Sequence, residues 1–201
     1  MAGRALKFVT VGDAAAEKTS FLVSFTHNIL PGEYLPTVFD NYKAAVVVDG
    51  NPLELTIYDT AANSDFDRLR PLSYPDTDVF LICFSVVSKS SFESVSTLWS
   101  PEIQHHCPGT PTLLVGLKSD LRASTAIEEC VTAEEATNLA ASLGLVGYRE
   151  CSAATQEGLQ EVFLTAARSA QSQSSPTPTS GRKRQLLKNW VGKVTKKGTP
   201  S

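Results

Sequence analysis

The sequence predicts an α/β fold in which helices cover both faces of a mainly parallel sheet. Segments with strand and helix patterns alternate along the chain, an order that is typical of layered α/β proteins. Two of the strand segments, residues 79–86 and 113–117, are continuous apolar runs, as expected for strands that are covered on both faces. A length of 201 residues suits one such domain with a short tail.

The remaining strand patterns are shorter. Residues 6–11 form an apolar run that ends at a glycine, and residues 148–151 are the last candidate strand. Residues 44–49 and 53–58 flank the sequence Gly-Asn-Pro at 50–52, and this arrangement predicts a β-hairpin.

Helix patterns lie between these strands. Helices are expected at residues 18–25, 90–105, 132–143 and 157–170. Thr132 and Glu135 have the spacing of a capping box, which predicts where the third of these helices begins. The second helix has an apolar stripe that is expected to face the core, formed by Phe92, Val95, Leu98 and Trp99.

The composition is that of an ordinary globular protein, with 42% hydrophobic and 19% charged residues. No run of 18 apolar residues occurs, and the N-terminal segment lacks the organisation of a signal peptide, so no membrane span or secretion is expected. The four cysteines have no metal-ligand spacing, and we interpret them as reduced packing residues of a cytosolic protein rather than as disulfides. They are Cys83, Cys107, Cys130 and Cys151.

Charge is distributed unevenly along the chain. Residues 180–201 carry seven basic side chains and no acidic one, so the preceding residues carry 11 basic and 21 acidic side chains. The Ser/Pro/Thr-rich segment 171–181 cannot bury enough apolar surface to fold. We therefore predict a folded domain at 1–170, a linker at 171–181 and a basic tail at 182–201. The tail is expected to bind a membrane surface or another polyanion, and no nucleic-acid partner is expected.

A candidate phosphate-binding loop follows the first strand directly. Residues 12–19, GDAAAEKT, stand between a strand and a helix, which is the setting of the pattern G-x-x-x-x-G-K-[ST]. In such a loop backbone N–H groups surround the phosphates, the lysine reaches the terminal phosphates, and the hydroxyl binds Mg²⁺. Gly12, Lys18 and Thr19 fit this pattern, whereas Glu17 occupies the second glycine position.

Glu17 is expected to oppose phosphate binding. The position favours a residue without a side chain, because the backbone must approach the phosphate and adopt unusual dihedral angles. A carboxylate about 4 Å from a phosphate costs roughly 4 kcal/mol at an effective dielectric constant of about 20. An ion pair of Glu17 with Lys18 or with Mg²⁺ would offset part of this cost. The loop pattern alone leaves nucleotide binding open.

Further motifs extend along most of the chain. They are LPGEYLPTVFDNY at 30–42, DTA at 59–61, FDRLRPLSYP at 66–75, LKSD at 117–120 and CSA at 151–153. With them, residues 5–170 resemble the Rho family of small GTPases, most nearly the Rac branch. The resemblance implies a Ras-like P-loop G domain whose mainly parallel, six-stranded sheet is flanked by helices on both faces.

The resemblance implies a guanine-nucleotide site. Asp120 would accept the two N–H donors of the guanine edge, Lys118 would pack across the base and brace the phosphate loop, and Ala153 would offer its backbone N–H to the guanine oxygen. The residues implied to bind nucleotide are Gly12, Ala14, Ala15, Ala16, Glu17, Lys18, Thr19, Ser20, Leu30, Tyr34, Thr37, Lys118, Asp120, Ser152 and Ala153.

The resemblance also implies Mg²⁺ as the cofactor of GTP or GDP. Thr19 and Thr37 would supply hydroxyls beside the metal, and Asp59 would orient a metal-bound water. The catalytic positions fall on Ala62 and Asn63, where the family has Gly-Gln. Asn63 is one methylene shorter than the glutamine that orients the attacking water, so slow or absent hydrolysis is expected.

The protein-binding surfaces, in contrast, are like those of the family. Effectors and exchange factors of the Rho type are the implied partners, in actin-linked signalling. Tyr58 stands where Rac-like proteins carry tryptophan, at a site that affects the choice of exchange factor. The implied effector surface consists of Tyr34, Pro36, Thr37, Val38, Phe39, Asp40, Asn41, Tyr42, Phe66, Arg68, Leu69 and Leu72.

The departures from the family fall mainly on the nucleotide side, apart from a shortened segment at 123–145. They are Ala14, Glu17, Leu30, Ala62, Asn63 and Leu117. Three hypotheses follow: a GTP-binding switch with very slow hydrolysis, a pseudo-GTPase that presents Rho-like surfaces without holding nucleotide, and a normal GTPase whose loops compensate. We favour the first.

The tail differs from that of the family, whose members usually end in a prenylation box. No cysteine follows Cys151, so neither prenylation nor palmitoylation of the tail is expected. Apolar residues at helical spacing predict a basic amphipathic helix that contacts anionic lipids; they are Leu186, Leu187, Trp190, Val191 and Val194. A nuclear-import-like cluster at 182–184 and a tail without a role are the alternatives. We expect a cytoplasmic monomer that associates peripherally with membranes.

Overall fold

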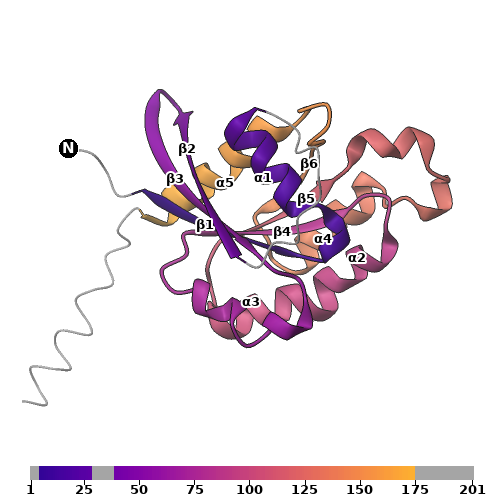
Figure 1. The fold of residues 1–201 in the computed structure, drawn as a ribbon, viewed down its shortest axis with the longest axis horizontal. Coiled ribbons are helices and arrows are strands. Elements are labelled where there is room, and N and C mark those ends of the chain that lie inside the picture. Colours follow the sequence, from indigo (N-terminus) through magenta and orange to yellow (C-terminus); the bar gives the residue numbers. More distant parts are fainter. Residues whose placement is uncertain (1–4, 29–38, 175–201) are drawn as a thin grey trace, which may run out of the picture. The chain divides into compact units, whose positions relative to one another are not determined.

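The computed structural model describes residues 5–28 and 39–174. In these residues six strands form one sheet with the order β2-β3-β1-β4-β5-β6. Only β2 and β3 pair antiparallel, and the other neighbours pair parallel. The fold is therefore the mainly parallel α/β fold that was predicted, and it can be followed in Figure 1. The strands are β1 (Leu6–Gly12), β2 (Phe39–Val48), β3 (Asn51–Thr60), β4 (Val79–Ser85), β5 (Thr112–Leu117) and β6 (Gly147–Glu150).

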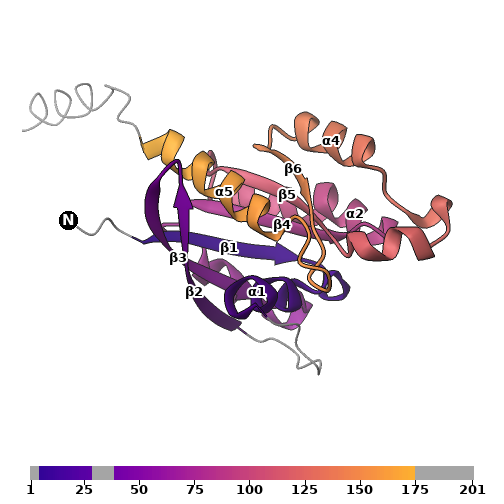
Figure 2. The ribbon, with the colours of Figure 1, turned by 90° about the horizontal axis from the view of Figure 1, so that it is seen from above.

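Helices cover both faces of this sheet, as Figure 2 shows from a second direction. Phe163 of α5 stacks on Phe21 and Phe25 of α1, and these rings pack on one face. Val95, Trp99 and the helices α3 and α4 pack on the other face. The α-helices are α1 (Lys18–His27), α2 (Lys89–Ser94), α3 (Ser100–His106), α4 (Ala133–Ser142) and α5 (Leu159–Ser174). Short 3-10 turns span Ala14–Ala16, Ser64–Phe66, Arg70–Ser73, Ser119–Ser124 and Ile127–Glu129.

The continuous apolar run of β4 is buried along its whole length, as predicted. Leu81 and Cys83 face the layer of α1 and α5, whereas Phe80 and Ile82 face the layer of α3 and α4. Because successive side chains of a strand point to opposite faces, both sides of a central strand must be apolar.

The hairpin forms where it was predicted, but its turn was placed wrongly. Asp49 and Gly50 both have positive φ angles, of 49° and 81°, and Val48 pairs with Asn51. The turn is thus the two-residue Asp-Gly turn that matches the twist of the strands. Pro52 lies inside β3; β1 begins to pair with this strand only at Leu55, so the missing N–H of proline lies outside that ladder.

The predicted helix at 90–105 exists, but it is not one regular α-helix. Residues Val95–Trp99 form a π-helical segment between α2 and α3. Val95 and Trp99 are buried as expected, whereas Leu98 is 45% exposed. The prediction for Leu98 was wrong because it assumed the period of an α-helix. The wider π turn moves this residue away from the stripe that faces the core.

Most of the other boundaries lie within two residues of those predicted, although β2 begins at Phe39, five residues before the predicted start at 44. Thr132 and Glu135 make the predicted capping box at the start of α4, whose helical residues end at Ser142, one before the predicted Leu143. Helix α5 continues to Ser174, beyond the predicted end at residue 170, so the first residues of the predicted linker are helical. The tail at 182–201 lies outside the described residues.

All four cysteines are free thiols, as predicted. Burial raises the pKa of Cys83 to about 12, which keeps this thiol protonated and unreactive. Among the described residues, no helix is long and apolar enough to cross a membrane.

Candidate functional site

The candidate phosphate loop lies between the end of β1 and the start of α1. Gly12 ends the strand with a φ of 143°, and a Cβ atom there would lie 2.1 Å from the carbonyl oxygen of Cys83 on β4. No side chain fits in that space, so this glycine is required by the close approach of two strands. Of the next residues, Ala14 and Ala15 are exposed and Ala16 is buried.

Lys18 is folded back into the loop. Its Nζ donates to the carbonyl oxygens of Gly12 at 2.6 Å and Asp13 at 3.1 Å, and only 5% of the residue is exposed. Burial lowers the pKa of this amine, while the charge of Asp59 opposes the shift. A lysine held in this way keeps its charge inside the loop, where a phosphate would lie.

Thr19 and Asp59 bring two oxygen ligands together. The hydroxyl of Thr19 donates to Oδ2 of Asp59 at 2.5 Å, although the two residues come from α1 and β3. Asp59 is fully buried. Hydroxyl and carboxylate oxygens are the ligands that Mg²⁺ prefers, so this pair fits the implied metal. Ser20, the next predicted residue, is half-buried on α1.

Glu17 adopts the backbone conformation expected of the glycine that it replaces, with φ 65° and ψ 43°. Of the two ion pairs that the sequence offered for its carboxylate, the one with Lys18 does not form. The carboxylate instead accepts from Nζ of Lys118 at 2.9 Å, in the guanine-reading motif. Lys18 does not make this ion pair because its amine is engaged with backbone carbonyls, and an ion pair of Glu17 with Mg²⁺ stays a prediction.

The residues predicted to read guanine lie after the ends of β5 and β6. Asp120 is exposed and lines a pocket of about 350 Å³ with Ser119 and Thr155. Ser152 is buried, and its hydroxyl accepts from the backbone N–H groups of Ala154 and Thr155 at 3.1 and 3.0 Å.

The loop after β6 is also tied to the first helix. The backbone oxygen of the half-buried Ala153 accepts from the hydroxyl of Ser24 on α1 at 2.8 Å. The loop is thus joined to the helix that begins at the phosphate loop.

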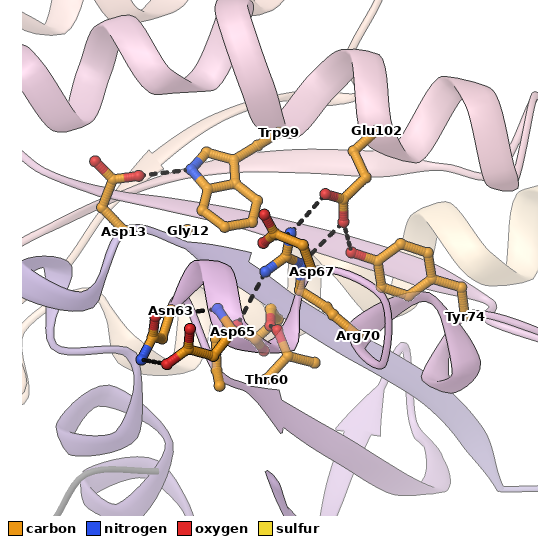
Figure 3. A network of polar contacts seen from close by, with 12 residues as sticks. Gly12, Asp13, Thr60, Asn63, Asp65, Asp67, Arg70, Tyr74, Trp99 and Glu102 are labelled. Carbon is orange, nitrogen blue, oxygen red and sulfur yellow. Dashed lines mark hydrogen bonds and ion pairs between the residues drawn. The ribbon is translucent and has the colours of Figure 1, made fainter. Parts of the chain in front are cut away.

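At the catalytic positions, Asn63 is engaged in a local turn. Its amide donates to Asp65 at 3.1 Å, and its oxygen accepts from the backbone N–H of Asp65 at 3.2 Å (Figure 3). Ala62 beside it is half-buried and has no polar side chain. The side chain that would orient an attacking water is therefore occupied within its own segment.

The predicted effector surface is described only in part. Leu30, Tyr34, Pro36, Thr37 and Val38 lie outside the described residues, and of Phe39 only the backbone in β2 is described. Asp40 and Asn41 are exposed on β2, beside the half-buried Tyr42.

The segment after β3 presents apolar surface. Leu69 and Leu72 are 55% and 74% exposed, Arg68 is exposed, and Phe66 is half-buried. Phe66, Leu69, Leu72 and Tyr58 line a pocket of about 480 Å³.

A buried polar network anchors this segment, and sequence reasoning missed it. Arg70 donates to both carboxylate oxygens of Glu102 at 2.9 and 2.6 Å, to Asp67 at 3.0 Å and to the carbonyl oxygen of Ala61 at 3.2 Å (Figure 3). The hydroxyl of Tyr74 also donates to Glu102. No local pattern in the sequence indicated this network, because Arg70 and Glu102 are 32 positions apart.

The network holds Glu102 in its charged form. Burial alone would raise the pKa of this carboxyl, but hydrogen bonds from Arg70 and Tyr74 and the charge of Arg70 lower it below the ordinary 4.5. A carboxyl whose pKa is lower in the folded than in the unfolded protein contributes its full stabilisation at pH values above the unfolded pKa. This contribution is lost as the pH falls through the folded pKa.

The substitution Glu102→Gln tests this assignment. We expect the difference in unfolding free energy between wild type and variant to be constant at neutral pH and to shrink as the pH falls below about 4.5. Urea unfolding at a series of pH values measures it. A difference that grows in acid would contradict the assignment.

The side chains of the candidate nucleotide site lie at the carboxyl ends of the strands. Lys18 follows β1, Asp59 is near the end of β3, Lys118 and Asp120 follow β5, and Ser152 follows β6. In mainly parallel α/β sheets, the carboxyl ends of the strands are where ligands bind. The family model of the Ras family matches residues 7–172, which include all of these side chains. The chain therefore belongs to the Ras family, and it is a small GTP-binding signalling protein.

Proposed function

We propose that this protein is an atypical, Rho/Rac-like GTP-binding switch that engages effectors through its switch regions and hydrolyses GTP slowly or not at all. The observation that carries the proposal is the position of Asn63. Its amide and its oxygen are both bonded to Asp65, and the preceding residue is alanine. No described side chain replaces the family's water-orienting glutamine at this point.

Retention of the nucleotide is supported by the parts of the loop that are intact. Lys18 keeps its charge inside the loop, and Thr19 with Asp59 offers oxygen ligands for Mg²⁺. Bound Mg²⁺ would neutralise part of the phosphate charge. Among this chain's residues, Lys18 would hold the terminal phosphates, Thr19 and Asp59 the metal, and Asp120 the guanine edge.

Engagement of Rho-type effectors and exchange factors is supported by the segment after β3. It exposes Leu69 and Leu72 beside a pocket of about 480 Å³, while Arg70 fixes its backbone from beneath. An exposed apolar patch of this kind is typical of a protein-binding surface. Tyr58 lines the same pocket, so the choice of exchange factor is expected to depend on it.

Restoring the family residues should restore hydrolysis. We expect the double substitution Ala62→Gly and Asn63→Gln to raise the single-turnover rate by at least about tenfold, since one transition-state hydrogen bond is worth roughly 10²- to 10³-fold in rate. Phosphate release from preloaded protein measures this rate. Asn63→Ala is the matched control and should leave the rate unchanged. An unchanged rate in the double variant, or a wild-type rate equal to that of ordinary family members, would refute the proposal.

One observation favours a second candidate, a pseudo-GTPase that binds Rho regulators or effectors without holding nucleotide. Glu17 replaces the loop glycine and places a carboxylate in the loop. Anion exchange of an extract from the purified protein separates the candidates. Stoichiometric guanine nucleotide excludes the second, and its absence even with excess GTP and Mg²⁺ excludes the first.

Membrane association stays a proposal from the sequence. The basic amphipathic pattern at 182–201 supports contact with anionic lipids at the cytoplasmic face of a membrane.

A further inference from the structure

The carboxylate of Asp13, in the phosphate loop, binds two donors from the helical segment that follows β4. Its Oδ1 accepts from Nε1 of Trp99 at 2.7 Å, and its Oδ2 accepts from the hydroxyl of Ser94 at 2.9 Å. Both oxygens are thus engaged by side chains more than 80 positions away in the sequence. These two bonds join the phosphate loop to the helical segment.

The π-helical segment explains why two donors converge on one carboxylate. Ser94 and Trp99 are five residues apart, and in a regular α-helix they would point about 140° apart. The π turn at Val95–Trp99 brings residues at this spacing to the same side. Interruptions of this kind are frequent at functional sites, and here the interruption serves the contact with Asp13.

Trp99 also contacts the segment after β3. The guanidinium of Arg70 lies over its ring, 4.7 Å from the ring centre. Arg70 in turn holds the carbonyl oxygen of Ala61 and the carboxylates of Asp67 and Glu102. Figure 3 shows the indole between Asp13 on one side and Arg70 on the other.

We propose that Trp99 is a positioning residue that couples the phosphate loop to the segment 61–73, so that a change at Asp13 alters the order of that segment without direct contact. The indole is only 1% exposed, and it contacts both Asp13 and Arg70. Its N–H fixes it to Asp13, and its ring supports the residue that anchors Ala61.

The coupling is a property of the chain itself and goes beyond the proposed function. It predicts how the loop and the segment 61–73 respond to each other whether or not nucleotide is bound. It can therefore be measured in protein freed of nucleotide and Mg²⁺ by EDTA.

Hydrogen exchange of peptides covering residues 61–73 tests the coupling in the full chain. Asp13→Ala should speed their exchange by about fivefold or more, although Asp13 touches none of these residues. Trp99→Phe, which keeps an aromatic ring beside Arg70 but removes the N–H together with the rest of the indole, should have a similar effect. The double variant should exchange no faster than either single variant, because both remove the same link. Ser94→Ala is the matched control: it removes the other donor to Asp13 and should change exchange by less than twofold.

Two results would overturn the proposal. One is unchanged exchange at 61–73 in Asp13→Ala; the other is an additive effect in the double variant, which is what separate structural roles for Asp13 and Trp99 would give. A second measurement identifies a failure of the proposed function instead. In Trp190→Phe, Trp99 is the remaining tryptophan of the two in the chain, and its emission should shift when GDP and Mg²⁺ are added. A second outcome is that the emission stays unchanged while the effects of Asp13→Ala and Trp99→Phe on exchange are not additive. That combination would mean that the link exists in a protein that does not bind the nucleotide.

Discussion

Replacing Glu17 by glycine is expected to raise the affinity for guanine nucleotide by about one to three orders of magnitude. The variant removes a carboxylate from the phosphate site, where an uncompensated charge would cost up to roughly 4 kcal/mol. It also relieves a left-handed backbone conformation, which costs a non-glycine residue about 1 kcal/mol. Titration of the nucleotide-free protein with a fluorescent GDP analogue in Mg²⁺ measures the change.

Glu17→Gln separates charge from backbone strain in this prediction. It keeps the size of the side chain and the left-handed conformation, so any gain in affinity over wild type comes from the lost charge. We expect an intermediate affinity. If both variants bind no more tightly than wild type, the ion pair with Lys118 at 2.9 Å neutralises Glu17 completely, and the expectation is wrong.

The unfolding free energy should respond weakly to the same change. The pair between Glu17 and Lys118 is partly exposed, with side-chain exposures of 49% and 19%, so its loss costs less than about 1 kcal/mol. The relief of backbone strain is of similar size and opposite sign. A large effect on affinity beside a small effect on stability would identify Glu17 as a residue that tunes ligand binding.

Replacing Arg70 by methionine should give the largest loss of stability, about 3–5 kcal/mol. The guanidinium is almost completely buried and donates to both oxygens of Glu102. Its removal leaves Glu102 inside the protein with Tyr74 as its neutral partner and frees the carbonyl oxygen of Ala61. Urea unfolding followed by circular dichroism measures the loss.

Two controls define the source of that loss. Arg68→Met changes an exposed arginine two residues earlier and should alter the unfolding free energy by less than about 0.5 kcal/mol. The double substitution Arg70→Met with Glu102→Leu should be more stable than Arg70→Met alone, because no charge is left unpaired. A double variant less stable than the single would show that packing, rather than the unpaired carboxylate, dominates.

Local patterns in the sequence predicted elements whose causes are themselves local. The capping box of Thr132 and Glu135 depends on residues three positions apart, and it formed as predicted. The turn was misplaced at Gly-Asn-Pro, although Asp49-Gly50 carried the stronger hairpin signal. Leu98 was assigned to the core because its spacing fits an α-helix, but it is exposed. No local pattern in the sequence predicted the π turn that moves it.

By itself, the sequence determined the mainly parallel sheet and the place of the phosphate loop at the end of the first strand. These features depend on periodicity and on residue identity at known spacings. Only the tertiary structure decided that Glu17 pairs with Lys118 and that Trp99 joins Asp13 to Arg70. Asp13 and Trp99 are 86 positions apart, and their contact exists because β1 and the helical segment after β4 meet at one end of the sheet. The sequence indicates that a charged group or an N–H group requires a partner. Which residue becomes that partner is determined by the tertiary fold.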